Sequence, residues 1–204
     1  MANFLAISAA GKAILRLLEN ANQTATGEVF AGAHFDLFSP GDFQNPVHFV
    51  NKTDVGASLY LYRVGLNAAR RNPGMQPAAD RRQVRYHLPL DLYYLLTPWA
   101  TSPDMAQRIL GWAMSILNQN AFLPAALLNS VGPEKEIFRT NESLEIIFDP
   151  LPLADMALLW EQLKDNRAMA SVSYLARVVI IESEVAIKDD RLVQTRQFDG
   201  AVID

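Results

Sequence analysis

The side chains that most often perform chemistry are few and scattered in this sequence. The three histidines, His34, His48 and His87, do not show the spacing of metal ligands. His34 and Asp36 would share one face of a strand, but the sequence supplies no evident third ligand. His87 and Asp91 would lie about 13 Å apart at ~3.3 Å per residue, which is too far for a catalytic couple. The histidines therefore predict neither a metal centre nor an acid–base site.

Motifs for nucleotides and nucleophiles are missing as well. A phosphate-binding loop around Gly11-Lys12 would need Gly at position 6 and Ser or Thr at position 13, and both are Ala. The sequence holds no Gly-x-Ser-x-Gly or Gly-x-Gly-x-x-Gly. Cysteine is absent, which excludes disulfides, thiolate metal sites and a cysteine nucleophile. We expect a protein that is not an enzyme and that binds no cofactor.

Composition sets the class of protein. The chain has 204 residues, half of them apolar and a fifth charged, which suits one globular domain. A net charge of −4 does not favour a general nucleic-acid binder. No apolar run approaches the roughly 20 residues that cross a membrane, and Lys12 falls inside the first apolar stretch, unlike in a signal peptide. We expect a cytoplasmic protein without membrane contact.

The strongest pattern lies in residues 85–100 and predicts one long strand at the middle of the core. Its residues alternate between an apolar face and a mixed face. The apolar face holds Leu88, Leu90, Leu92, Tyr94 and Leu96. Pro89 is tolerated near the start of a strand, and Pro98 should end the strand, because proline has no amide hydrogen to donate.

Two more strands are apolar on both faces, which predicts that they are central and covered on both sides. In residues 57–67, Leu59 and Leu61 should face opposite to Tyr60, Tyr62, Val64 and Leu66. In residues 171–183, one face should hold Val172, Tyr174, Ala176, Val178 and Ile180, and the other Leu175, Arg177, Val179 and Ile181. Arg63 should pair with a charge on a neighbouring strand or at an interface, with Asp91 as the candidate.

The remaining elements complete an α/β (α+β mixed) fold. Strands are predicted near 33–38 and 143–148, and helices at 4–21, 103–118, 124–128 and 153–164. Ser102 is the expected N-cap of the second helix, with Pro103 in its first turn. We expect a single domain over residues 1–183, with one mixed sheet of four or five strands packed by about three main helices.

Two segments outside this body are candidate partner-binding sites. The long connection 68–84 joins two strands and is locally basic, which suits either a solvated loop or a loop that docks on an acidic partner. Its arginines, with one at the start of the next strand, are Arg70, Arg71, Arg81, Arg82 and Arg85. Residues 184–204 form a C-terminal arm in which spaced apolar residues stand among charges, with six acidic and three basic side chains from Glu182 onward. The arm either covers its own subunit or contacts a partner through Val185, Ile187, Leu192, Val193 and Phe198.

Four segments, in this order and spacing, carry a family resemblance. They are Ser58-Leu59-Tyr60-Leu61-Tyr62-Arg63-Val64, Leu88–Ala100 with the motif Leu-Asp-Leu-x-Tyr-Leu-Leu-Thr-Pro, Ile109-Leu110-Gly111-Trp112-Ala113-Met114, and 171–183. With the Trp160 helix, they resemble the cap or tail-terminator proteins of phage-tail-like contractile injection systems of the antifeeding-prophage and virulence-cassette type. The resemblance runs from about residue 4 to 183. Some members carry a further C-terminal domain, which we do not expect here.

The resemblance implies a structural role. Such a protein forms a ring, expected to be a hexamer, on the tube end distal to the baseplate, and it ends the growth of tube and sheath. Its implied partners are further copies of itself, the inner tube protein and the sheath protein. It would be cytoplasmic during assembly and part of a particle that can be released. The alternatives are a nucleic-acid or nucleotide-binding module that uses the arginines of residues 70–85, and an enzyme with a site of unknown type.

Overall fold

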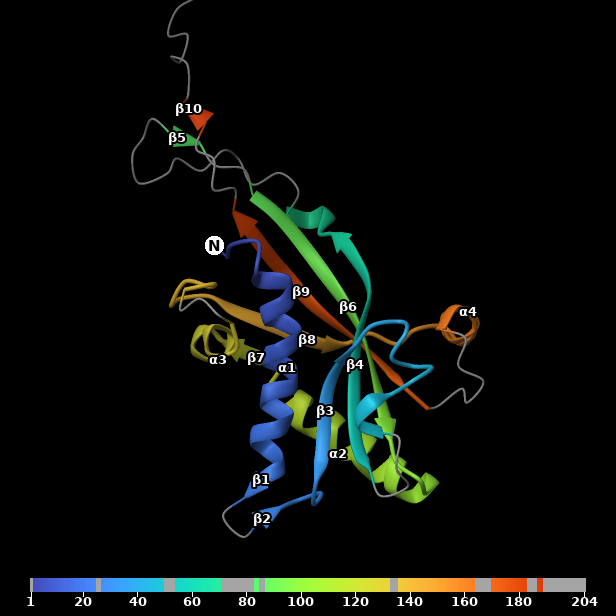
Figure 1. Cartoon of the computed structure of the whole chain (residues 1–204). Coiled ribbons are helices and arrows are strands. Elements are labelled where there is room, and N and C mark those ends of the chain that lie inside the picture. Colours follow the sequence, from blue (N-terminus) through green and yellow to red (C-terminus); the bar gives the residue numbers. More distant parts are fainter. Residues whose placement is uncertain are drawn as a thin grey trace, which may run out of the picture.

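The computed structural model describes residues 2–24, 27–49, 54–70, 83–84, 87–132, 136–163, 170–182 and 187–188. Its main strands are β3 Ala33–Phe38, β4 Val55–Leu66, β6 His87–Trp99, β7 Phe122–Pro124, β8 Ser143–Phe148 and β9 Val172–Glu182. They form one six-stranded sheet in the order β3-β4-β6-β9-β8-β7 (Figure 1). β3 and β4 are parallel and all other neighbours are antiparallel, so the sheet is mixed. The predicted fold class is confirmed, with β7 as an extra edge strand too short to show an alternation.

The helices of the described residues are α1 Ala6–Asn22, α2 Pro103–Gln119, α3 Ala125–Ser130 and α4 Leu153–Leu163. Two 3-10 turns, η1 Val47–Phe49 and η2 Ala68–Arg70, lie in the connections. Two short pairs stand apart from the main sheet: β1 Gln23–Thr24 with β2 Gly27–Glu28, and β5 Gln83–Val84 with β10 Ile187–Lys188. Figure 1 shows β5 and β10 beyond the ends of β6 and β9.

The start of α2 confirms the predicted capping. The Ser102 hydroxyl accepts a hydrogen bond from the Met105 backbone N–H at 3.1 Å, and Pro103 occupies the first turn. The hydroxyl thereby satisfies a donor that the helix itself leaves unpaired. Ile109, Ala113 and Leu117 make the buried face of the helix.

The helices α1, α2 and α3 pack on one side of the sheet, which we call the helix face. Its apolar core combines residues of α1 with Leu92, Tyr94 and Leu96 of β6 and Ala176 of β9. The opposite side, the aromatic face, is covered by α4 and the segment between β3 and β4. Its cluster consists of Phe43, Phe49, Leu95, Trp99, Trp160 and Leu163. The long strand β6 contributes side chains to both clusters, which confirms the prediction that it forms the middle of the core.

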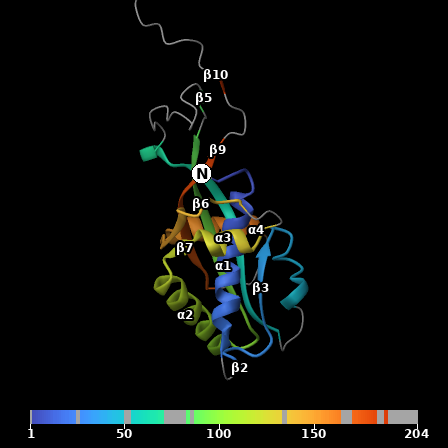
Figure 2. The ribbon, with the colours of Figure 1, turned by 90° about the vertical axis from the view of Figure 1, so that its left-hand side faces the viewer.

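α1 crosses the helix face diagonally (Figures 1 and 2). Just before the helix, Ala2 bridges to Ile181 of β9. Midway along it, Gly11 packs so closely against Leu37 of β3 and Tyr94 of β6 that a Cβ atom would come within 3.0 Å of the Leu37 side chain. Gly11 therefore serves close packing rather than phosphate binding. This diagonal course leaves one corner of the sheet, where β4 ends and β6 begins, without a covering helix (Figure 1).

Pro98 does not end β6 as predicted, since the strand continues to Trp99 and aligns Pro98 with Ala57 of β4. The pairing of β6 with β9 extends only to Leu96 and Val172. Beyond Leu96 the strand therefore has a paired neighbour on one side only. A proline is tolerated there because its missing N–H can face the unpaired side.

A bulge in β9 changes the predicted faces of that strand. Leu92 pairs with Ala176 and Leu90 with Val179, so β9 carries one more residue than β6 between these pairs. Val178 has a φ of 58°, a left-handed conformation that costs energy in a β-branched residue. The prediction that Val178 continues the face of Tyr174 and Ala176 was wrong, because the bulge turns Val179 into the core in its place.

A second register shift lies in β4, where Leu61 pairs with Tyr94 and Arg63 with Tyr93. The extra residue is Tyr62, so the alternation reverses beyond it. Val64 and Leu66 pair with Leu92 and Leu90, whose side chains belong to the helix face. The prediction that they share a face with Tyr60 was therefore wrong, and this shift brings two apolar side chains to the uncovered corner.

Candidate functional site

The structure brings the two predicted partner-binding segments together at the backbone. In the short antiparallel pair, Ile187 of the arm aligns with Val84 and Lys188 with Gln83 of the connection to β6. Arg70 lies in η2 and is exposed. The other predicted contact residues, Arg71, Arg81, Arg82, Arg85, Val185, Leu192, Val193 and Phe198, lie outside the described residues. They stay predictions from the sequence.

A carboxylate anchors the segment that carries Arg70. Both oxygens of Asp91 accept hydrogen bonds from the Asn67 side-chain amide at 3.0 Å, and one also accepts from the Val178 backbone N–H at 3.1 Å. The Asn67 side-chain oxygen in turn accepts from the Arg70 backbone N–H at 3.1 Å. One side chain of β6 therefore ties the end of β4 to the bulge of β9.

This arrangement replaces the predicted pair of Arg63 and Asp91. The Arg63 guanidinium instead lies over the ring of Tyr93, 4.8 Å from its centroid. The shift in β4 places Arg63 opposite Tyr93 and aligns Gly65 with Asp91. A cation over an aromatic ring contributes only about 0.5–1 kcal/mol at an exposed site. Arg63 therefore contributes little stability and leaves a positive charge at the surface.

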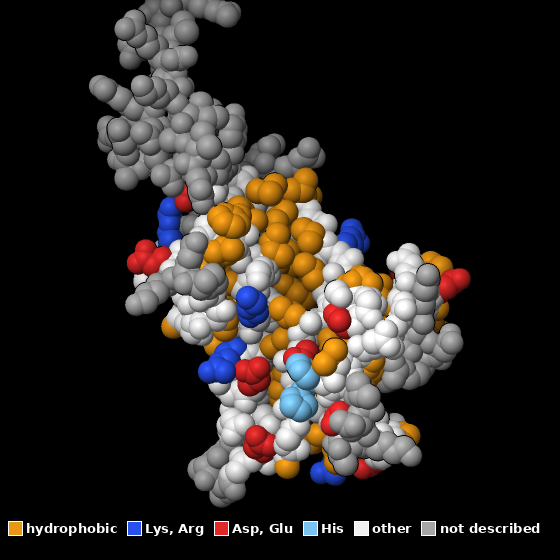
Figure 3. Space-filling model, viewed as in Figure 1, with side chains coloured by type: hydrophobic (Ala, Val, Ile, Leu, Met, Phe, Trp, Pro, Cys, Tyr) orange, Lys and Arg blue, Asp and Glu red, His pale blue; other side chains and the backbone are white. Residues whose placement is uncertain are grey.

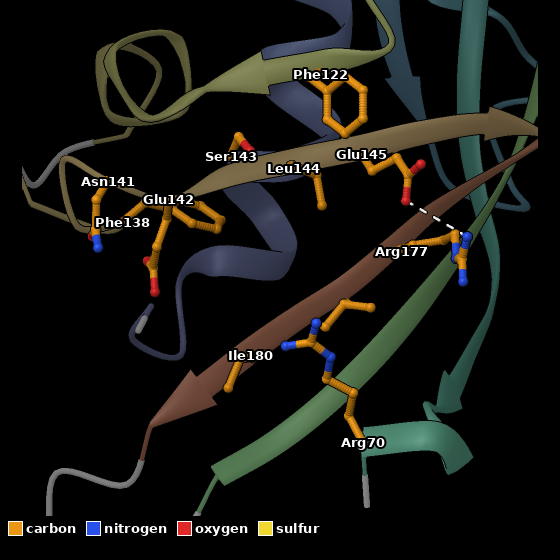
Figure 4. Close-up of a pocket in the computed structure, with 11 residues that line it drawn as sticks. Arg70, Phe122, Phe138, Asn141, Glu142, Ser143, Leu144, Glu145, Arg177 and Ile180 are labelled. Atoms are coloured by element: carbon orange, nitrogen blue, oxygen red, sulfur yellow. Dashed lines mark ion pairs between the residues drawn. The ribbon is translucent and has the colours of Figure 1, made fainter. Parts of the chain in front are cut away.

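A hollow of about 450 Å³ lies beside this cluster, between η2 and the strands β7, β8 and β9. Arg70 extends into it over Ile180, and Phe122 and Glu145 line the opposite wall (Figure 4). Arg177 and Glu145 form a long ion pair of 3.6 Å at its rim. The hollow combines an aromatic wall with charges of both signs. It suits contact with a polar protein surface better than enclosure of a small molecule.

Two of the three histidines, His34 and His48, come closer together than the sequence suggested. His48 stacks on His34 with 5.4 Å between ring centroids, and its Nδ1 lies 2.7 Å from a carboxylate oxygen of Asp36. Folding thus brings a third polar residue beside the pair that shares a strand. Even so, the described residues contain no group of three or more side chains arranged to hold a metal ion.

An exposed apolar patch occupies the uncovered corner of the helix face. Val64 and Leu66 at the end of β4 are 47% and 54% exposed, and Leu88 at the start of β6 is 46% exposed. Figure 3 shows hydrophobic side chains gathered over this end of the sheet. Sequence reasoning missed the patch because the β4 shift moves Val64 and Leu66 across the sheet. The only sequence signal for it was a run of apolar residues on both faces of the strand.

Across the described residues, no helix is long and apolar enough to cross a membrane. The features that remain as candidates for function are the charged hollow, the apolar patch and the paired segments β5 and β10. The patch lies on the end of β4 and the start of β6, the hollow lies between η2 and the strands β7, β8 and β9, and β5 and β10 lie beyond the ends of β6 and β9 (Figure 1).

Comparisons with known proteins give a family match and two solved structures that resemble this chain. The Pvc16 N-terminal domain family matches residues 11–195. The sheath/tube terminator of the PVC extracellular contractile injection system, in its extended state, has the same fold, with a TM-score of 0.56 and 16% identity over 99% of this chain. This chain spans 65% of that terminator's length. The tube-terminating cap of the anti-feeding prophage aligns over 74% of this chain and 50% of its own, at 14% identity and a TM-score of 0.44. No curated protein sequence matches.

Proposed function

This chain belongs to the Pvc16 N-terminal domain family, and on that premise we propose that it is a structural cap of a contractile injection particle. In this proposal it forms a ring on the tube end distal to the baseplate and ends the growth of tube and sheath. The observation that carries the proposal is the family match over residues 11–195, on a chain that shares its fold with a sheath/tube terminator.

The ring is proposed to be a hexamer, because a six-fold tube is closed most simply by a cap of the same symmetry. Its partners are further copies of the chain, the inner tube protein and the sheath protein. The test is the mass of the species bound to purified particles, measured by light scattering after release. A six-copy species, with particles of uncontrolled length when the chain is absent, supports the proposal. A strictly monomeric species, both free and on particles, contradicts it.

A structural role is proposed in place of a catalytic one. The hollow beside Arg70 is open, and the histidine cluster lies on a different part of the surface, next to β3. We place the chain in the cytoplasm during assembly and in the particle afterwards. Turnover of a phosphoester or peptide library by the purified chain would contradict the structural role.

The basic connection 68–84, together with Arg85, is proposed to dock on an acidic surface of a neighbouring protein. Each exposed ion pair contributes only about 0–1 kcal/mol, so binding must come from the cluster rather than from one residue. Replacing Arg70, Arg71, Arg81, Arg82 and Arg85 together by Gln should weaken association with particles and flatten its dependence on salt. A control replaces Arg16 and Arg108, which are exposed elsewhere on the body, by Gln, and its loss per charge removed is compared with that of the five-fold variant.

Two outcomes would contradict the docking role of this connection. The first is unchanged association of the five-fold variant at both low and high salt. The second is binding of DNA or RNA by the intact chain with a steep salt dependence, which would favour the nucleic-acid alternative. Association should be measured by co-sedimentation with particles at several salt concentrations.

The C-terminal arm, residues 184–204, is proposed to serve assembly rather than the core of the body. Its described residues, Ile187 and Lys188, pair with β5 in a two-stranded sheet that is separate from the main sheet. A chain truncated after Ser183 should remain folded by circular dichroism but no longer stay on particle ends. Unfolding of the truncated chain, or unchanged capping, would contradict this role.

A further inference from the structure

One stretch of β4 is a strand edge without a neighbour. The edge strand β3 pairs with β4 only from Val55 to Tyr60. Beyond that point, residues 61–66 pair with β6 on one side, and no described strand pairs with them on the other. The outward backbone groups of this stretch form a row of hydrogen-bonding sites that is regular over residues 63–66, beyond the register shift at Tyr62. Such a row is a ready template for one more strand.

The two faces of this open edge differ in chemistry. On the helix face it is apolar, because Val64, Leu66 and the adjacent Leu88 are each about half exposed. On the aromatic face it carries the exposed guanidinium of Arg63 above Tyr93. A strand that adds here should therefore place apolar side chains on one face and an acidic or polar one on the other.

The C-terminal segment 189–204 has the required composition. It contains Leu192 with the β-forming residues Val193, Thr195 and Phe198, and its four aspartates outnumber its two arginines, Arg191 and Arg196. Its 16 residues can extend over about 50 Å at ~3.3 Å per residue, whereas the open stretch of six residues needs about 20 Å. Length and charge both suit this segment as the occupant.

The proposed ring requires a contact between copies, which favours the β4 edge of a neighbouring copy over that of the same chain. Ile187 and Lys188, which precede the segment, pair with β5 in a separate two-stranded sheet, and Figure 1 shows this pair beyond the end of the main sheet. A contact of the C-terminal segment of one copy with the β4 edge of the next is heterologous. Repeated with rotation, such a contact closes a ring.

We propose that residues 189–204 of one copy add as a strand to the β4 edge at residues 61–66 of the next copy and cover the patch of Val64, Leu66 and Leu88. This inference rests on the proposed ring function and names its subunit contact. The added strand gains backbone hydrogen bonds along the edge, and its apolar side chains bury the patch. Arg63 pairs with an acidic residue of the incoming segment.

Cysteine cross-linking tests the contact directly, because the chain has no cysteine of its own. Three double variants combine Val64→Cys with Leu192→Cys, Val193→Cys or Thr195→Cys, which samples neighbouring registers. Two cysteines form a disulfide only when their Cα atoms lie within about 7 Å. We expect one of the three to give a ladder of cross-linked copies on a non-reducing gel. The control replaces Val64→Cys by Leu158→Cys, an exposed apolar position on α4, and should give no ladder.

Failure to form a ladder in all three registers would overturn the proposal, and so would a disulfide formed only within one chain. A second measurement uses Leu66→Lys, because lysine on an edge strand opposes strand addition. We expect about tenfold weaker self-association, equivalent to about 1.4 kcal/mol, and no change for Leu158→Lys. Equal self-association of both variants would count against the proposed contact.

The readouts separate this inference from the function on which it rests. If the chain caps particles as a ring but shows no ladder, the subunit contact is wrong and the function stands. If it neither assembles nor caps particles, both are wrong.

Discussion

The two ends of β6 lie in different surroundings. From Tyr94 to Trp99 every residue is buried, between the helix-face core on one side and the aromatic cluster on the other. From His87 to Tyr93 the strand is covered incompletely, and Leu88 is about half exposed. We call the end of the sheet at Tyr94–Trp99 the closed end and the end at His87–Tyr93 the open end. Both ends have apolar sequence, so composition alone does not decide which one is covered.

The two ends also differ in backbone regularity. At the closed end, β4 and β6 pair without interruption from Gly56–Trp99 to Leu61–Tyr94. The open end contains the register shift at Tyr62, the bulge at Val178 and the buried side chain of Asn67 bound to Asp91. Regular pairing with close packing serves stability, whereas bulges redirect side chains toward a surface. This contrast is what the following experiments test.

The largest difference should appear between two leucines of equal size. Leu96→Ala at the closed end removes a fully buried side chain and should lower the free energy of unfolding by about 2–5 kcal/mol. Leu66→Ala at the open end should cost less than about 1 kcal/mol, because that side chain is already half exposed. Urea denaturation of the two variants measures both values. Similar losses would mean that the two ends do not differ in burial.

The next effect concerns the anchor of the open end. Asp91→Ala leaves the Asn67 amide and the Val178 N–H without their acceptor and should cost about 1–3 kcal/mol. Glu161→Ala on the exposed side of α4 is the matched control and should change stability by less than about 0.5 kcal/mol. If the two variants unfold at the same urea concentration, the carboxylate does not hold the bulge.

A smaller effect, which differs between the two ends of β9, is expected from glycine substitutions. Val178→Gly should be neutral or stabilising, because a β-branched residue at φ 58° carries about 1–2 kcal/mol of backbone strain. Val172→Gly, in ordinary strand conformation at the closed end, should cost about 1 kcal/mol or more. Thermal unfolding of both variants compares them. A destabilised Val178→Gly variant would show that packing of the valine outweighs its strain.

The last effect is absent at neutral pH and concerns Tyr94 and Tyr174, which pair across β6 and β9. Burial raises the pKa of Tyr174 to about 12 and also raises the pKa of Tyr94, from an ordinary value near 10. The unfolded chain thus loses these protons at a lower pH than the folded one. Their contribution to stability is complete below pH 10 and is lost as pH rises toward 12 and above.

Urea midpoints measured between pH 9 and 12 should therefore fall for the intact chain, and fall less for Tyr174→Phe. Tyr62 lies on the aromatic face and hydrogen-bonds to Ser173, and burial raises its pKa too. The Tyr62→Phe variant therefore compares a second partly buried phenol of the same sheet with Tyr174. A Tyr174→Phe variant with the full loss of stability at high pH would contradict the role of this buried phenol.

The sequence by itself determined the main strands and helices and their order. The alternation around Leu92 to Leu96, the cap at Ser102 and the period of α1 are local patterns, and each was confirmed within a few residues. The family was suggested separately, by the resemblance of segments in these elements to cap and tail-terminator proteins, and the family match over residues 11–195 confirms it. Local patterns suffice for the elements because burial on one face repeats with the period of the strand or helix.

Only the tertiary structure decided which residues meet across strands. The extra residues at Tyr62 and Val178 reverse the alternation beyond them, and no local signal marks either position. The partner of Asp91 was missed for the same reason, because register decides whether Arg63 or Gly65 lies opposite it. The open edge and its apolar patch exist because β3 stops pairing at Tyr60 and α1 crosses the sheet elsewhere. Strand pairing and helix position depend on contacts distant in sequence, so single-strand periodicity does not contain them.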